Sequence, residues 1–384
     1  MTPVPENSPD IAKWLQLIRA DGVGPVSFAK ILKRFGSVDA ALGASVSGLT
    51  KVEGIGYKTA ERIAATREAF DAKAELELAG KLGVWIIHFQ DPRYPTMLKR
   101  VYDPPPVLYV RGTLGSEDTL SVAIVGSRRC SIYGQEQASR LAHLLAASGF
   151  TIVSGLARGI DTAAHQGALA AEGRTIAVQG CGLANVFPPE NVKLFELISQ
   201  SGACLSELPL RYEPLRENFP PRNRIIAGLS LGTIVIEAGL RSGALITAQT
   251  ALESNREVMA VPGKVDSPLS KGPHQLIKQG AKLIESVDDV MEALGYVGDQ
   301  LKEYTALAAK EAAEKVETPL FEPAHFNLKD HERRIYETLG REPLHSDQVI
   351  AETTLPAGAV HAGLVSLRLK GLIRHLPGNR FARR

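Results

Sequence analysis

Residues 120–129 read LSVAIVGSRR, a short apolar run that ends at a glycine and is followed by polar and basic residues. This pattern predicts a buried strand of a parallel sheet, because such strands are covered on both faces. The glycine turn would lead into a helix whose free backbone N–H groups can bind an anion. Four later segments repeat the pattern of an apolar run closed by glycine: 150–155, 175–180, 232–239 and 257–263.

Helical patterns lie between these strand candidates, as repeated βαβ units require. The expected helices are 133–148, 160–172, 190–200, 242–254 and 287–294. The alternation predicts an α/β fold with a mainly parallel sheet and helices on both faces.

Composition narrows the class of protein. The chain has 384 residues, enough for two to four domains at roughly 100 to 200 residues each. No apolar run approaches the roughly 20 residues of a membrane helix, and the first residues lack the basic and apolar regions of a signal peptide. We therefore expect a cytoplasmic protein with no membrane span. The widely spaced Cys130, Cys181 and Cys204 favour free thiols, and a net charge of +2 means that local clusters must attract any nucleic acid.

Residues 8–72 form the first expected domain, which is helical in pattern. It contains two glycine turns, GVGP at 22–25 and VEGIG at 52–56, which resemble the helix-hairpin-helix motif. In that motif a glycine turn exposes backbone N–H groups to a phosphate, and here Lys58 and Arg62 would lie on the helix that follows. Contact with DNA and a small bundle used for protein contacts both remain open.

The second expected domain, 73–297, contains the sheet and a proline-rich lead-in, which we expect to add an edge strand or two. Residues 298–324 are rich in Ala, Glu and Lys and are expected to be a linker. The pattern of residues 325–384 predicts three helices (near 330–339, 346–352 and 356–370) followed by a hairpin. Three helices and a hairpin form the winged-helix arrangement. Its basic residues include Arg374 and Arg380, and contact with nucleic acid or with protein remains open.

Ligands of an open parallel sheet bind beyond the carboxyl ends of its strands. The residues expected there are donors suited to an anion, with one aromatic ring: Gly126, Ser127, Arg128, Arg129, Ser154, Gly155, Arg158, Phe219, Arg222, Asn223, Arg224, Ser242 and Gly243.

A nucleotide cofactor is not expected. The first turn, GSRRCSIYG, does not spell G-x-G-x-x-G, and the chain has no Walker A motif. The catalytic candidates at the strand ends are Asp161, His165 and Glu237. Asp161 is interpreted as a helix cap, His165 as a packing or hydrogen-bonding residue, and Glu237 as an ion-pair partner of Arg222 or Arg224. We therefore predict no catalytic residue, no metal site and no cofactor.

Several long segments resemble the DprA/Smf family of DNA-processing proteins: GSRRCSIYG (126–134), IVSGLARGIDTAAHQGAL (152–169), FPPRNRIIAGLS (219–230), IEAGLRSGALITAQTALESNREVMAVPG (236–263) and DPRYPTMLKRVYDPPPVLYVRG (91–112). The resemblance implies an extended Rossmann-like fold in the central domain. The N-terminal helix-hairpin-helix (SAM-like) and C-terminal winged-helix units are both known accessories of that family.

The resemblance also implies a function. Members are not known as enzymes; they bind single-stranded DNA, protect it and load the RecA recombinase during natural transformation, and they form homodimers. It suggests Ser127, Arg128, Arg222 and Arg224 as phosphate ligands, with Asn223 and Gly243 close by, and Phe219 for base stacking. The alternative is an enzyme, because residues 232–239 (GTIVIEAG) also resemble the Rossmann-like nucleotide phosphoribohydrolases.

Overall fold

The computed structural model describes residues 5–295, 330–340, 344–353, 355–356, 359–360, 364, 367, 373–376 and 380–383. The chain divides into two compact units, Met1–Thr305 and Ala306–Arg384. The expected linker at 298–324 lies outside the described residues, as do most residues of the helix expected at 356–370. None of the described helices is long and apolar enough to cross a membrane.

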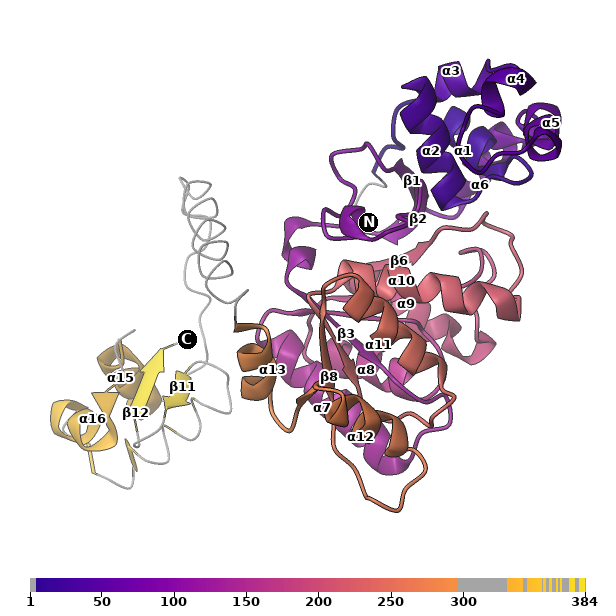
Figure 1. Ribbon diagram of the computed structural model, residues 1–384. Helices are drawn as coiled ribbons and strands as arrows, with labels where there is room; N and C mark the ends of the chain where they lie inside the picture. Colours follow the sequence, from indigo (N-terminus) through magenta and orange to yellow (C-terminus); the bar gives the residue numbers. More distant parts are fainter. Residues whose placement is uncertain are drawn as a thin grey trace. The chain divides into compact units, whose positions relative to one another are not determined.

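The first unit is built on one nine-stranded sheet with the order β1-β2-β6-β5-β4-β3-β7-β8-β9 (Figure 1). All neighbours from β6 to β9 are parallel, whereas β1 and β2 pair antiparallel with each other and β2 pairs antiparallel with β6. The mainly parallel sheet is thus confirmed. Its strands are β1 (Val84–His88), β2 (Val107–Gly112), β3 (Ser121–Val125), β4 (Thr151–Ser154), β5 (Thr175–Val178), β6 (Ala203–Ser206), β7 (Gly232–Val235), β8 (Glu257–Ala260) and β9 (Lys282–Leu283).

Both faces of the sheet are covered by helices, which explains why the central strands β3, β4, β5 and β7 are buried along their whole length. On β3, Val122 and Ile124 enter one apolar cluster while Ala123 and Val125 enter another, because successive side chains point to opposite faces. The first face carries α7 (Ile132–Ala147), α8 (Ile160–Ala170), α9 (Val192–Ser201) and α13 (Val287–Ala293); the second carries α10 (Phe219–Leu229), α11 (Gly243–Glu253) and α12 (Lys271–Lys278).

The sequence did not lead us to β6, α10 or α12. The most consequential of these is α10, because it carries the FPPRNR segment (219–224), to which the sequence assigned no secondary structure. Both prolines lie in the first turn of the helix, at Pro220 and Pro221. Proline is favourable there, since the first backbone N–H groups of a helix have no partner within the helix.

The lead-in supplies β1, which is the expected edge strand of the sheet, and β2, which lies between β1 and β6. Every residue of β1 is buried, because an N-terminal group of helices covers one of its faces. Trp14 and Leu15 share an apolar cluster with Val84 and Ile86. The helices are α1 (Ile11–Arg19), α2 (Pro25–Phe35), α3 (Val38–Leu42), α4 (Val46–Leu49), α5 (Tyr57–Thr66) and α6 (Ala72–Lys81).

The described part of the C-terminal unit contains α15 (Asp330–Thr338), α16 (Ser346–Thr353) and a three-stranded sheet of order β10-β12-β11. The strands are β10 (Leu344–His345), β11 (Ile373–Leu376) and β12 (Arg380–Arg383), with β11 and β12 paired antiparallel as the expected hairpin. A small apolar cluster that includes Ile335, Val349 and Phe381 joins helices and strands. This arrangement agrees with a winged-helix domain.

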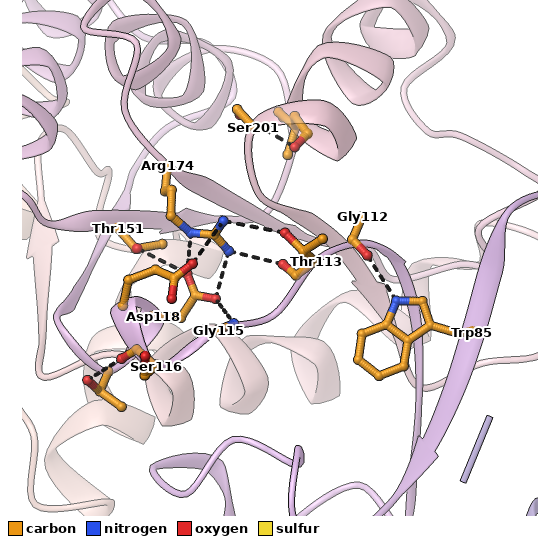
Figure 2. A network of polar contacts seen from close by, with 12 residues as sticks. Trp85, Gly112, Thr113, Gly115, Ser116, Asp118, Thr151, Arg174 and Ser201 are labelled. Carbon is orange, nitrogen blue, oxygen red and sulfur yellow. Dashed lines mark hydrogen bonds and ion pairs between the residues drawn. The ribbon is translucent and has the colours of Figure 1, made fainter. Parts of the chain in front are cut away.

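A polar network closes the amino end of the sheet (Figure 2). Arg174, just before β5, donates to both carboxylate oxygens of Asp118 at 3.0 and 2.8 Å and to the Thr113 carbonyl at 3.0 Å. Asp118 also accepts from the Gly115 N–H and the Thr151 hydroxyl. The network fixes the connection between the antiparallel β2 and the parallel β3, at the edge opposite to the strand carboxyl ends.

We expect Asp118→Asn to lower the free energy of unfolding by about 1–3 kcal/mol, because it removes the carboxylate that accepts two hydrogen bonds from the half-buried Arg174 guanidinium and leaves only the more exposed ion pair with Glu117. The matched control is Glu117→Gln, since Glu117 pairs with the same arginine at 3.3 Å but its side chain is 52% exposed. That change should cost about 0.5 kcal/mol or less. Urea denaturation measures both; equal losses would contradict the role given to Asp118.

Candidate anion-binding site

A cavity of about 440 Å³ opens at the carboxyl ends of the central strands. The chain runs from β3 to β4, β5 and β6 on one side and returns to β7, β8 and β9 on the other, so the strand order reverses between β3 and β7. Ligands of open α/β sheets bind at such reversals. The cavity is lined by Val125, Gly126, Ser127, Arg128, Arg129, Ala157, Asp161, Arg216, Phe219, Pro220, Arg222, Asn223, Ile226, Ser242, Gly243, Ala244, Ile246 and Thr247.

The first helix at this reversal, α7, does not offer its N-terminus to a ligand. Glu237, at the end of β7, accepts a hydrogen bond from the Ser131 N–H at 2.8 Å and another from the Ser131 hydroxyl at 2.6 Å. This buried carboxylate therefore occupies the positive end of α7. The expected pairing of Glu237 with Arg222 or Arg224 is wrong, because its carboxylate is engaged by Ser131. A carboxylate at this helix start disfavours a second anion there.

The N-terminus of α11 faces the cavity instead. Ser242 is its N-cap and accepts from the Ala244 N–H at 3.3 Å, and Ser242, Gly243 and Ala244 all line the cavity. Asn223 of α10 donates to the Gly243 carbonyl at 3.3 Å and so holds the start of α11 beside α10. Gly243 has open space around the position of a side chain, which leaves its backbone accessible to a ligand.

The turn after β3 is held rigidly by backbone contacts. The Ser127 N–H donates to the Glu237 carbonyl at 2.7 Å, and the Ser127 carbonyl accepts from the Ile160 N–H at 3.3 Å. Gly159 packs against this turn so closely that a Cβ would lie 2.4 Å from the Ser127 carbonyl oxygen. The side chains of Arg128 and Arg129 extend from this fixed turn and are exposed.

Arg222 forms the floor of the site. It is buried and donates through Nη1 to the Gly155 carbonyl at 2.7 Å and to the Val178 carbonyl, which ties together the ends of β4 and β5. Burial lowers the pKa of Arg222 to about 10, so the group is still a cation at neutral pH. Its Nε is buried and has no hydrogen-bond partner, and Arg222 lines the cavity.

The ring of Phe219 lies close to two guanidinium groups. The guanidinium carbon of Arg128 lies 4.9 Å from the centroid of its ring and that of Arg222 lies 5.8 Å from it. The ring packs against Gly180, where a Cβ would lie 3.0 Å from Phe219 Cδ1. Phe219 is half-buried, and it lines the cavity.

Arg224 is not brought to the cavity, although the sequence predicted it there. Its guanidinium makes two hydrogen bonds of 2.7 Å to Glu207 and lies 2.9 Å from Asp103. Arg222 and Arg224 are two residues apart on α10, and side chains at that spacing point to different sides of a helix. Arg224 therefore anchors α10 on the side away from the cavity.

Three other predicted residues, Ser154, Gly155 and Arg158, do not line the main cavity. Ser154 is buried and donates its hydroxyl to the Ile124 carbonyl at 2.6 Å. Arg158 is exposed and forms an ion pair with Glu190. Gly155 lies under Arg222, where a Cβ would meet the guanidinium at 2.5 Å, and it lines a second, shallower hollow together with Arg158.

The remaining catalytic candidates have structural partners. His165 is buried with Nδ1 2.7 Å from the Thr175 hydroxyl, and burial lowers its pKa to about 3, so the expected hydrogen-bonding role is confirmed. Asp161 was expected to cap its own helix; it accepts instead from the N–H groups of Gly155 and Ala157, at 3.1 and 3.4 Å. Burial raises the pKa of Asp161. Within the described residues, no group of His, Cys, Asp and Glu could hold a metal ion.

Sequence reasoning missed Arg216, which lines the cavity from the short 3₁₀ helix η4 (Arg216–Asn218). The only feature of the sequence that could have pointed to Arg216 as a site residue was its position just before FPPRNR (219–224). The cavity therefore has four arginines, Arg128, Arg129, Arg216 and Arg222, against the single carboxylate of Asp161. Such a surplus of fixed positive charge in a concave site attracts anions.

The candidate accessory residues lie in the other domains. Lys58 and Arg62 are exposed on α5, after the Gly54–Gly56 turn. Arg380 is exposed at the start of β12, and Arg374 lies on β11 opposite Ala382.

The contact between Glu237 and α7 requires a glycine at position 134, where a Cβ would lie 2.4 Å from Glu237 Oε2. We therefore expect Gly134→Ala to destabilise the protein by about 1–3 kcal/mol through loss of these hydrogen bonds. The control is Gly80→Ala in α6, which meets nothing within 4 Å and should stabilise the protein by about 0.5–1 kcal/mol. Thermal and urea unfolding would show the opposite signs; a gain in both variants would contradict the proposed contact.

A mainly parallel sheet with an arginine-lined cavity at its strand reversal defines the class of Rossmann-like proteins. Comparison with known proteins specifies the family. Residues 85–295 match the family model "DNA recombination-mediator protein A", residues 9–70 match "DprA-like N-terminal HHH domain" and residues 319–379 match "DprA winged helix domain". The chain belongs to the DprA/Smf family of DNA-processing proteins.

Relatives from bacteria agree with this assignment. Protein Smf of Synechocystis is 38% identical over 97% of this chain and 98% of its own length. DNA processing protein DprA of Streptococcus pneumoniae is 46% identical over 52% of this chain and 71% of its own length. The crystal structure of DprA from S. pneumoniae aligns with 75% of this chain and 98% of that one, with 35% identity and a TM-score of 0.66.

Proposed function

We propose that this protein binds single-stranded DNA by placing a backbone phosphate in the cavity at the sheet edge. The observation that carries the proposal is the combination of four arginines with the open N-terminus of α11 in one cavity. Guanidinium groups and backbone N–H groups bind phosphate without reading a base. We therefore expect weak sequence preference.

Phe219 supports a single strand over a duplex. Its ring is half-buried beside the phosphate donors and lies under the guanidinium of Arg128. An unpaired base next to a bound phosphate can stack on such a ring, whereas the bases of a duplex are already stacked on one another. Stacking contributes roughly 1–3 kcal/mol per base and tolerates any base.

The finer function follows from membership of the family. We propose that the protein protects single-stranded DNA, since a strand bound in a cavity is less accessible to nucleases, and that it loads RecA during natural transformation in the cytoplasm. No cofactor enters this function. The engagement of Glu237 by Ser131 and of Asp161 by backbone N–H groups supports a role without catalysis. The phosphoribohydrolase alternative is not favoured.

The terminal domains are proposed as accessories. The N-terminal domain would add contacts to DNA or to protein through Lys58 and Arg62. The C-terminal domain would do so through Arg374 and Arg380. The central cavity supplies the main affinity in either case.

Arg128→Ala should weaken the binding of a fluorescein-labelled poly-dT oligonucleotide to the full chain by at least tenfold, measured by fluorescence anisotropy. It should also reduce the slope of log affinity against log salt by about 0.7, the value of one phosphate contact on a single strand. Arg140→Ala is the charge-matched control, because Arg140 is exposed on α7 and does not line the cavity. Unrelated oligonucleotides should bind the parent with similar affinity.

Two results would contradict the proposal. Unchanged affinity in Arg128→Ala, with the fold intact by circular dichroism, would move the DNA site to the terminal domains. A hundredfold spread of affinity among unrelated sequences would show base recognition, which a phosphate cavity does not provide.

Dimer formation is also proposed, with the helix over residues 244–252 at the interface. Three apolar side chains on or beside α11 are exposed: Leu240 at 61%, Ile246 at 46% and Leu252 at 52%. Exposed apolar groups gathered on one element are typical of an interaction surface.

Leu252→Asp should shift the protein from dimer to monomer in sedimentation velocity, because a carboxylate would be buried without a partner in the interface. Leu197→Asp on α9 is the control, since Leu197 is equally exposed at 52%. A dimer that survives Leu252→Asp would place the interface elsewhere.

A further inference from the structure

A second, much smaller hollow of about 10 Å³ adjoins the main cavity and shares Arg128, Ala157 and Phe219 with it. Its other walls come from the loops after β4 and β5: Gly155, Arg158, Phe187 and Pro188. The Phe187 and Phe219 rings lie 5.8 Å apart between centroids at an angle of 53°. The two rings thus form one continuous aromatic surface that leads away from the main cavity.

The hollow repeats the arrangement of the main cavity. The Arg158 guanidinium carbon lies 5.9 Å from the centroid of Phe187, as that of Arg128 lies 4.9 Å from the centroid of Phe219. A cation beside an aromatic ring can bind a phosphate and stack the neighbouring base. Two such pairs side by side suit two consecutive nucleotides.

The two pairs differ in charge. Arg128 takes part in none of the ion pairs found among the described residues. Arg158 is held by Glu190, which accepts from its Nε and, at 3.0 Å, from its Nη2. The Glu190 carboxylate thus occupies the two parallel donors that a phosphate would use.

We propose that Phe187 and Arg158 form a second nucleotide subsite, and that Glu190 acts as an internal competitor which a backbone phosphate must displace from Arg158. The proposal rests on the single-stranded DNA binding proposed above and names Glu190 as a regulator of the affinity of that same site. The competition is weak enough to be overcome, because the Arg158 and Glu190 side chains are 52% and 50% exposed and exposed ion pairs are weak.

The competition predicts a gain of affinity when the competitor is removed. In the full chain, Glu190→Gln should tighten the binding of labelled poly-dT about two- to fivefold at low salt, the range of an exposed ion pair. The slope of log affinity against log salt should be at least as steep in Glu190→Gln as in the parent, since Arg158 still binds a phosphate. Phe187→Leu, which keeps an apolar side chain, should weaken binding about fivefold or more through loss of stacking.

The control for the removed charge is Glu217→Gln. Glu217 is exposed in η4, next to the cavity residue Arg216, and belongs to no ion pair among the described residues. A gain from Glu217→Gln equal to that from Glu190→Gln would show a general field effect and overturn the competition.

A double-mutant cycle decides whether Glu190 acts through Arg158. The gain from Glu190→Gln should largely disappear in an Arg158→Ala background; a full gain there would overturn the proposal. Arg128→Ala in the same assay tests the main phosphate cavity separately from the second subsite. Loss of binding in Arg128→Ala, with no effect of Glu190→Gln or Phe187→Leu, would remove the second subsite alone. Unchanged binding in Arg128→Ala would overturn the proposed phosphate site in the main cavity, and with it the second subsite, and would move the DNA site to the terminal domains.

Discussion

The geometry of the candidate anion-binding site depends on one carboxylate, that of Glu237, which does not itself line the cavity. Glu237 follows β7 and satisfies the N–H and hydroxyl groups of Ser131, so it occupies the N-terminus of α7. Its own carbonyl also fixes the turn after β3 by accepting from the Ser127 N–H. Because a helix N-terminus that already holds a carboxylate repels a second anion, we propose the start of α11 as the helix terminus that faces the anion.

A second constraint comes from arginines used as structural ties. Arg222 binds the carbonyl groups at the ends of β4 and β5, and Arg224 binds Glu207 and Asp103. The two side chains leave α10 on different sides, so one helix is fastened to the sheet ends and to the loop before β2 at once. The close approach of Arg222 to the strand end requires Gly155, where any Cβ would overlap the guanidinium.

The sequence predicted much of the fold and part of the site. The five glycine-closed apolar runs became β3, β4, β5, β7 and β8, and most tip residues reached one cavity because parallel strands end at one edge. It did not reveal α10, since proline marks both loops and first turns of helices. Without that helix, the opposite directions of Arg222 and Arg224 could not be predicted, and Arg216 had no visible signal.

The sequence by itself therefore determined the strand pattern, the sheet edge at which the cavity lies and the family, because these depend on local periodicity and on motifs that are continuous in the chain. Tertiary structure alone decided which charges face the cavity. Glu237 meets Ser131, and Arg158 meets Glu190, across long separations in sequence. Such pairings follow from how strand ends and helix starts converge in space, and short-range patterns carry no record of that convergence.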